Sequence, residues 1–217
     1  MKKESKLTKE SIIGNYAKMI LEESKKPNSI YHFCQSLKIE ETQFYQFFSS
    51  FEHLEESVFE SFFENTLNLL SKSKEYNDYD AKTKLLSFYF TFFEQLTANR
   101  SLVIYLLSNE KNKLENLKKL SGLRNHFKKY IDGLGIETVN IPQEKIQKIQ
   151  QKSISEMAWL QMLMTLKFWM DDKSPSFEKT DIFIEKSVHA SFDMLDITPL
   201  KNIIDFGKFL WKEKMNN

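Results

Sequence analysis

The sequence predicts an all-α protein, and three observations lead to this fold class. Glycine and proline are scarce, with 5 and 4 residues in a chain of 217, whereas folds built from many strands need these residues for their turns. Apolar residues recur at the helical period of about 3.6 residues in successive segments. Aromatic residues make up 14% of the chain, which supplies enough large apolar side chains for a substantial core.

Successive helices can be placed along the chain from this periodicity. The first begins at the predicted N-cap Thr8 and ends before Pro27, because the residue before a proline is pushed out of the helical conformation. Ser29 is expected to cap the second, and Gly133 and Gly135 end the seventh. The predicted helices cover residues 8–24, 30–37, 40–48, 51–73, 85–96, 102–107, 114–131, 142–168 and 182–195, and Thr198–Pro199 begins a further one.

Residues 85–93 form the most apolar stretch of the chain, with the sequence LLSFYFTFF. Such a run is compatible with a buried strand or a buried helix, since periodicity alone does not separate the two. The apolar pattern continues to Leu96 and has helical segments on both sides. We therefore predict a buried central helix rather than a strand.

Charge and composition restrict the classes of protein. The formal net charge of +1 gives the whole chain no electrostatic attraction to nucleic acid. No stretch approaches the roughly 18 consecutive apolar residues that span a bilayer, so we expect no membrane insertion. The N-terminus lacks the apolar run of a signal peptide, and the single Cys34 fits a reducing compartment. A cytoplasmic protein is therefore expected.

Motifs for catalysis are missing from the sequence. It contains neither a glycine-rich phosphate loop nor a nucleophile elbow, and its four histidines lie far apart without metal-ligand spacing. We predict no enzymatic activity, no cofactor and no metal site. The charged pairs Glu55–Glu56, Lys118–Lys119 and Asp171–Asp172 are interpreted as solvated surface.

Two stretches carry a resemblance to a known family. Residues 37–54 contain an apolar turn residue, a short helix with two pairs of aromatic residues, and the sequence Ser50-x-Glu52-x-Leu54 at the start of the next helix. This order resembles the helix-turn-helix domain of TetR/AcrR-family transcriptional regulators. Residues 168–181, in which a tryptophan and acidic residues precede a Ser/Pro turn and Thr-Asp, are similar to the break before the last helix of that family's C-terminal domain.

The resemblance implies a domain organisation and a mode of action. A three-helix helix-turn-helix domain would occupy residues 1–48, and a helical bundle of the TetR type, for ligand binding and dimerisation, would occupy residues 49–217. Family members are homodimers in which helices 8 and 9 of each subunit form a four-helix interface. Helices 4 to 7 enclose a ligand pocket, and a bound ligand changes the spacing of the two DNA-reading heads. The helix after Thr198 lies beyond the common core.

The resemblance also indicates three groups of candidate site residues. Duplex DNA would be contacted by Lys38, Thr42, Gln43, Tyr45 and Gln46. A pocket for a small apolar ligand would be lined by Phe63, Phe88, Phe92, Tyr105, Phe127 and Trp159, although the same aromatic side chains also fit an ordinary core. The homodimer would pair through Met157, Leu160, Met164, Phe183, Phe192 and Leu195, since two-fold closure is the commonest oligomer solution.

The chain departs from the family at positions expected to face DNA. Lys38 stands where the family usually has glycine, Glu40 stands where it has a small N-capping residue, and Phe51 replaces a lysine that holds a phosphate. Residues 27–64 have a formal charge of −6, because seven glutamates accompany one lysine. Phosphate contacts supply most non-specific DNA affinity, so two interpretations stay open. One is a ligand-responsive DNA-binding regulator in which Lys38 and the N-terminal lysines hold phosphates, and the other is a dimeric ligand- or protein-binding module.

Overall fold

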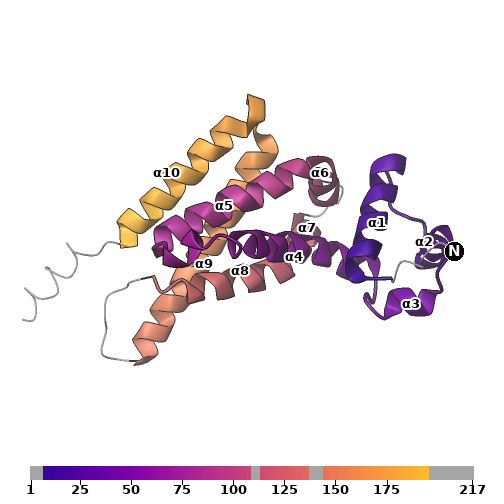
Figure 1. Ribbon diagram of the computed structural model, residues 1–217, viewed down its shortest axis with the longest axis horizontal. Coiled ribbons are helices and arrows are strands. Elements are labelled where there is room, and N and C mark those ends of the chain that lie inside the picture. The colour runs from indigo at the N-terminus through magenta and orange to yellow at the C-terminus, as the bar shows by residue number, and fades with distance from the viewer. Residues whose placement is uncertain (1–6, 109–112, 137–143, 196–217) are drawn as a thin grey trace, which may run out of the picture. The chain divides into compact units, whose positions relative to one another are not determined.

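The computed structural model describes residues 7–108, 113–136 and 144–195 (Figure 1). Every regular element among these residues is a helix, so the all-α fold is confirmed. None of the described helices is both long and apolar enough to cross a membrane. The predicted helix after Thr198 and the candidate phosphate ligands Lys2, Lys3 and Lys6 lie outside the described residues.

The N-terminal helices begin at hydrogen-bonded caps. Thr8, Ser29 and Ser50 each accept a backbone N–H three residues later, at 3.1, 3.1 and 3.3 Å, which satisfies donors left unpaired at a helix start. The predicted caps Thr8 and Ser29 are therefore confirmed. These first helices are α1 (Lys9–Glu23), α2 (Ile30–Leu37), α3 (Glu41–Tyr45) and α4 (Phe51–Leu70).

The remaining regular elements of the described residues are helices as well. They are η1 (Glu75–Asp78), α5 (Ala81–Ala98), α6 (Arg100–Ser108), α7 (Lys113–Lys118), α8 (Ser121–Gly133), α9 (Glu144–Asp171), η2 (Pro175–Phe177) and α10 (Glu178–Leu195). Helix α5 includes residues 85–93, which excludes the strand interpretation.

Two predicted helices differ from the observed ones. The helix predicted over residues 40–48 is the single short turn α3, and the one predicted over 114–131 is divided into α7 and α8. Lys119 and Leu120 form the turn between α7 and α8, and both are buried. The Lys119 ammonium donates to the Leu106 carbonyl at 2.8 Å. Because the leucine spacing continues across this turn, the apolar pattern could not indicate it.

The chain divides into two compact units, which are described separately. The first unit contains Met1–Lys72 and Thr91–Phe127, and the second contains Ser73–Phe90 and Lys128–Asn217. Within the first unit, α1 packs against α4 and α6, and α2 packs against α3. Within the second, α9 packs against α10. The functional boundary after Phe48 stays a prediction.

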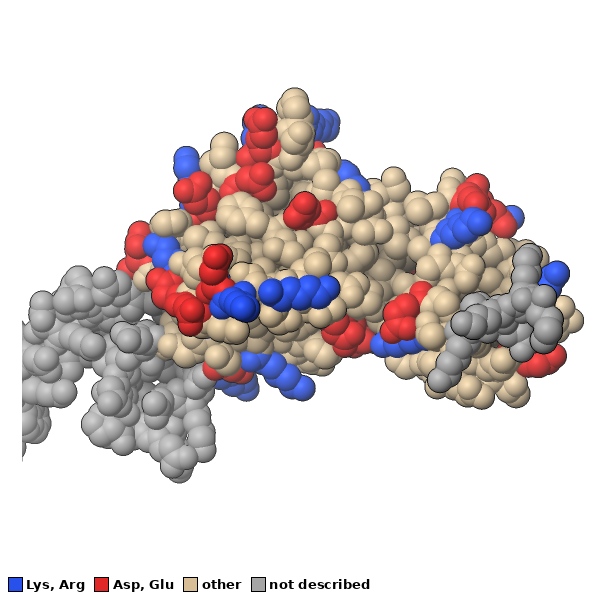
Figure 2. Space-filling view, in the orientation of Figure 1, with Lys and Arg blue, Asp and Glu red and all other residues tan. Residues whose placement is uncertain are grey.

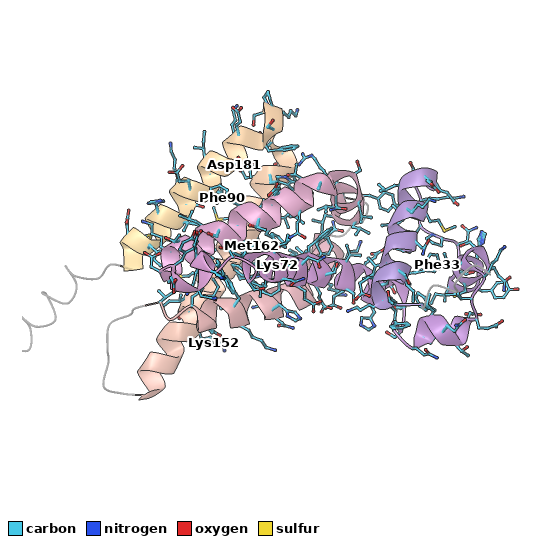
Figure 3. All side chains as sticks on the ribbon, in the orientation of Figure 1. Phe33, Lys72, Phe90, Lys152, Met162 and Asp181 are labelled. Carbon is cyan, nitrogen blue, oxygen red and sulfur yellow. The ribbon has the colours of Figure 1, made fainter. Side chains whose placement is uncertain are left out.

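An aromatic cluster forms the core at the N-terminal end of the first unit. Tyr16, Phe33, Phe44 and Phe48 are at most 1% exposed, and Figure 3 shows Phe33 within the cluster of α1, α2 and α3. The Phe33 ring meets the Tyr16 and Phe44 rings edge to face, at 5.8 and 6.1 Å. Each such burial contributes roughly 1.5–3 kcal/mol, so this cluster fixes the short α3 on its neighbours.

A buried carboxylate organises the corner between α9 and α10 in the second unit. Asp172 accepts hydrogen bonds from the backbone N–H and hydroxyl of Ser174, at 2.8 and 2.7 Å, and from the same groups of Thr180, at 2.9 and 2.7 Å. Burial alone would raise its pKa, but these four donors outweigh that effect and lower the pKa to about 2. The interpretation of Asp172 as solvated surface is therefore wrong.

Candidate nucleic-acid and dimer interfaces

The candidate DNA-contact residues lie on the short helix α3 or close to it in sequence. Lys38, Thr42, Tyr45 and Gln46 are exposed. Tyr45 is 51% exposed while its neighbour Phe44 is fully buried, so the aromatic cluster holds one face of α3 and leaves the other face accessible. This arrangement has the accessibility that contacts to a nucleic acid require.

The fifth candidate, Gln43, has a structural task of its own. Its side-chain oxygen accepts the backbone N–H of Glu40 at 3.0 Å, and the residue is half-buried. This bond satisfies one of the unpaired donors at the start of α3. A glutamine three residues after an N-cap is a recognisable capping signal, so the sequence holds a cue for this role of Gln43 besides the predicted DNA contact. Gln46 is therefore the more accessible of the two candidate glutamines.

The backbone at Lys38 has a conformation that favours glycine. Lys38 ends α2 in the left-handed conformation, with φ of 57°. Its N–H donates to the Gln35 carbonyl, and the N–H of Ile39 donates to the Cys34 carbonyl, both at 3.1 Å. A side chain in this conformation is strained and glycine is not. The chain therefore tolerates strain at the position where it has its single cation between Pro27 and Glu64.

Phe51 belongs to the aromatic cluster instead of holding a phosphate. Its ring stacks on that of Tyr16 at 5.2 Å and lies 5.8 and 6.0 Å from the rings of Phe33 and Phe44. A lysine at this position could not make these ring contacts. Phe51 thus contributes to packing of the aromatic cluster where a lysine would offer a candidate phosphate contact.

The acidic residues of α4 are partly neutralised inside the first unit. Glu55 is fully buried, and its carboxylate lies 2.9 Å from the Lys26 ammonium and 3.2 Å from that of Lys119. Glu60 lies 3.6 Å from Lys9. The interpretation of Glu55 and Lys119 as solvated surface is wrong, and the count of −6 overstates the negative charge available to repel DNA. Lys9 and Lys26 are correspondingly less available to phosphates.

Charge is mixed over the visible surface. Figure 2 shows acidic and basic side chains interspersed over this face of the described residues. At the start of α3, the N-cap Glu40 is exposed and Glu41 is partly exposed. These two carboxylates are therefore the acidic groups that stand closest in sequence to the candidate DNA contacts.

The candidate dimer residues of α9 form an exposed apolar stripe. Met157, Leu160 and Met164 are 58%, 58% and 55% exposed, and their spacing of three and four residues places them on one side of the helix. On α10, Phe183 and Phe192 are half-buried. For Leu195, the last residue of α10, the structure describes the backbone and not the side chain. Large apolar side chains exposed together indicate a surface that another molecule covers.

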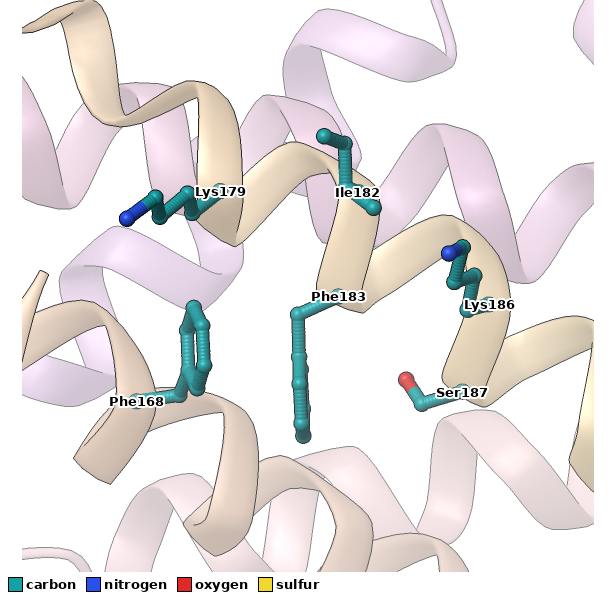
Figure 4. A pocket seen from close by; sticks show the side chains of 6 residues that line it. All are labelled: Phe168, Lys179, Ile182, Phe183, Lys186 and Ser187. Carbon is teal, nitrogen blue, oxygen red and sulfur yellow. The ribbon is translucent and has the colours of Figure 1, made fainter. Parts of the chain in front are cut away.

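A groove lies on the same two helices (Figure 4). It has a volume of about 460 Å³ and is lined by Phe168 from α9 and by Lys179, Ile182, Phe183, Lys186 and Ser187 from α10. The rings of Phe168 and Phe183 are stacked at 4.6 Å with an interplanar angle of 15°. Ile182 is 49% exposed. Neither Phe168 nor Ile182 is among the predicted interface residues, although Phe168 follows Met164 by one helical turn.

The six candidate ligand-binding residues are divided between the two units. Phe63, Phe92, Tyr105 and Phe127 belong to the first, and Phe88 and Trp159 belong to the second. Tyr105 is half-buried and the other five are at most 8% exposed. Burial of this kind is expected for a closed pocket and for a packed core alike, so both interpretations stay open.

Polar groups accompany the aromatic residues of the second unit. The hydroxyl of Tyr130 lies 2.8 Å from that of Tyr76 and donates to the Lys84 carbonyl at 3.1 Å. The Tyr130 ring lies 4.8 Å from that of Phe88. These hydroxyls are candidates for orienting a weakly polar ligand. In the part of the chain that the structure describes, no group of three or more His, Cys, Asp or Glu residues could hold a metal ion.

Comparison with known protein families gives a match over more than half of the chain. Residues 84–210 match the family described as "Tetracyclin repressor-like, C-terminal domain", and no curated protein matches the chain. The match includes the start of the segment after Thr198, which the resemblance places beyond the common core. Because the matched residues make up more than half of the chain, the protein belongs to the family with a tetracyclin repressor-like C-terminal domain.

Proposed function

We propose that the protein is a TetR-like transcriptional regulator of the cytoplasm that binds duplex DNA as a homodimer and responds to a small apolar ligand. One observation carries the proposal. In a chain of this family, the aromatic cluster holds α2 and α3 so that Lys38, Thr42, Tyr45 and Gln46 are exposed around one short helix. Exposed polar side chains on the second helix of a helix-turn-helix are those that reach base edges and phosphates.

The exposed residues divide into phosphate contacts and a base contact in this proposal. Lys38 neutralises a phosphate, and the hydroxyls of Thr42 and Tyr45 donate to phosphate oxygens. The Gln46 amide can pair with the edge of an adenine in the major groove. The internal ion pairs of Glu55 and Glu60 support the proposal, because they remove two carboxylates from the repulsion that DNA would meet.

The homodimer and the ligand are supported by different parts of the chain. The stripe of Met157, Leu160 and Met164 continues to the groove at Phe168, and a second copy would cover both. The buried aromatic residues offer an apolar environment with few polar groups, which suits an apolar or weakly polar ligand.

The alternative function is a dimeric ligand- or protein-binding module that does not bind DNA. Glu40 and Glu41 favour it, because their carboxylates lie beside the candidate DNA contacts. The incorporation of Phe51 into the aromatic cluster favours it as well. A carboxylate facing a phosphate is repelled and also loses hydration.

Binding to random-sequence duplex DNA over a salt series tests the proposal. We expect log K to fall by roughly 0.9 per log unit of salt for each neutralised phosphate. Glu41→Lys should raise this non-specific affinity and steepen the slope by roughly one contact. Glu64→Lys makes the same charge change at an exposed position of α4 and should have the smaller effect. Unchanged affinity and slope in Glu41→Lys would favour the alternative.

Binding to a DNA sequence that the protein recognises specifically provides the second measurement. Lys38→Ala should weaken binding to all sequences alike, whereas Gln46→Ala should relax the preference at one base position and cost about 1–3 kcal/mol there. Gln43→Ala is a poorer probe because it also removes the cap of α3. If Gln46→Ala leaves the preference intact at every position, Gln46 does not read a base.

A further inference from the structure

Glu55 is a buried acidic residue for which DNA contact, dimerisation and ligand binding provide no role. It lies on α4 with none of its surface exposed. Its carboxylate accepts a hydrogen bond from the Tyr16 hydroxyl of α1 at 2.6 Å. Lys26, between α1 and α2, lies 2.9 Å away, and Lys119, between α7 and α8, lies 3.2 Å away. One carboxylate thus connects three segments that are distant in sequence.

Lys119 extends this connection to a further helix. It is 6% exposed, and its ammonium donates to the Leu106 carbonyl of α6 at 2.8 Å as well as pairing with Glu55. The chain Leu106–Lys119–Glu55–Tyr16 therefore runs from α6 through the turn before α8 and α4 to α1. All of these residues belong to the first unit.

Other acidic residues of α4 also contact α1 and α8. Glu60 pairs with Lys9 of α1, and its carboxylate occupies the space that a Cβ on Gly122 of α8 would fill. The Ser121 hydroxyl of α8 donates to Glu56. Helix α4 is therefore fixed to the first turn of α8 and to α1 by neighbouring acidic side chains.

A gain in stability is a weak explanation for such a cluster. Removing a carboxylate and ammonium groups from water is costly, and well-packed apolar residues are often equally stable or more so. Charged hydrogen bonds, by contrast, require specific distances and directions. The cluster therefore restricts where its partner segments can lie relative to α4.

We propose that Glu55 is a positioning residue that couples the turn between α7 and α8 to α1 and the start of α2. A displacement of Lys119 alters the charge balance around the Glu55 carboxylate, and the Tyr16 and Lys26 contacts respond. The use of this coupling to control DNA contact rests on the proposed function, whereas the coupling itself does not. An effector that moves α6 or α8 would act through it.

Hydrogen exchange in the full-length protein tests the coupling. Glu55→Gln keeps the shape of the side chain but leaves Lys26 and Lys119 without their carboxylate. We expect amides of α1 and α2 to exchange at least about tenfold faster, while those of α9 and α10 change less than about twofold. Glu64→Gln, the same change at an exposed position of α4, should leave both regions unchanged.

Lys119→Met distinguishes coupling from simple loss of stability. The substitution is remote in sequence from α1, yet it should accelerate exchange in α1 and α2. Combined with Glu55→Gln, it should add less than about twofold to the effect of Glu55→Gln alone, because both changes break one network. Independent, multiplying effects, or equal acceleration throughout both units, would overturn the proposal.

A milder variant keeps the test decisive if these proteins fold poorly. Tyr16→Phe removes only the hydroxyl that donates to Glu55, and it should accelerate exchange in α1 and α2 by about threefold. Unchanged exchange in Tyr16→Phe would overturn the coupling. The DNA salt series is a separate measurement. A protein that does not bind DNA but shows the expected exchange pattern would support the coupling and contradict the proposed function.

Discussion

Lys38 combines two properties that are usually separate. Its backbone has a φ of 57°, a conformation that costs a residue with a Cβ about 1–2 kcal/mol, and among lysines and arginines it is the nearest to α3 in sequence. Ser24, at the end of α1, has nearly the same backbone conformation with φ of 54°. Comparing substitutions at Lys38 and Ser24 therefore separates the effect of backbone strain on stability from the effect of the lysine charge.

We expect Lys38→Gly to stabilise the fold by about 1 kcal/mol, because glycine removes the strain and loses only part of the gain to unfolded-state entropy. Urea unfolding measures the change, and Ser24→Gly should have a similar effect. Only Lys38→Gly should also weaken DNA binding. A less stable Lys38→Gly would show that the lysine side chain makes a contribution larger than the strain.

At the scale of elements, the corner between α9 and α10 decides how the candidate dimer helices are presented. Asp172 accepts four hydrogen bonds there, including the N–H of Thr180 near the start of α10. A carboxylate at the start of a helix is favoured by unpaired N–H groups and the helix dipole. The Trp, acid, Ser/Pro and Thr-Asp pattern of residues 168–181 thus has a physical cause.

Asp172→Asn should destabilise the second unit by about 1–2 kcal/mol at neutral pH, the range for a lost capping carboxylate. Because the folded pKa is lowered to about 2, the contribution is fully present above the ordinary value near 3.8. It is lost as the pH falls from there to about 2. Thermal unfolding at several pH values measures it.

Asp171→Asn is the matched control for this prediction. Asp171 is exposed and pairs with Lys167 on the surface of α9, where such pairs contribute less than about 0.5 kcal/mol. An equal loss of stability in both variants would mean that the hydrogen bonds of Asp172 do not stabilise the corner between α9 and α10.

At the scale of the whole molecule, the exposed apolar side chains of α9 and α10 are the candidate centre of the proposed homodimer interface. Met157, Leu160 and Met164 are each more than half exposed, and the groove at Phe168 and Phe183 continues their face. A stable homodimer would bury at least about 1,000 Å² in total. The stripe supplies the apolar centre that such an interface requires.

In the proposed homodimer, Leu160→Glu should produce a monomer at micromolar concentration, because a carboxylate without a partner would be buried at the interface. Sedimentation equilibrium measures the mass. Leu69→Glu introduces the same change at a leucine of α4 that is 49% exposed and should stay dimeric. A dimeric Leu160→Glu would place the interface elsewhere.

The sequence predicted those features that depend on neighbouring residues. Helix order followed from apolar periodicity, and the starts at Thr8 and Ser29 followed from residue types that satisfy the first free N–H groups. Each of these depends on interactions within about one turn of helix.

The sequence by itself determined the all-α fold, because periodicity, caps and turn residues act over a few positions, and its match over residues 84–210 identified the family. Only the tertiary structure decided the burial of Glu55 with Lys119, the break between α7 and α8, and the inclusion of Phe51 in the aromatic cluster. In each case the deciding partner is distant along the chain. A charged or aromatic residue has the same local pattern whether it meets water, an opposite charge or another ring.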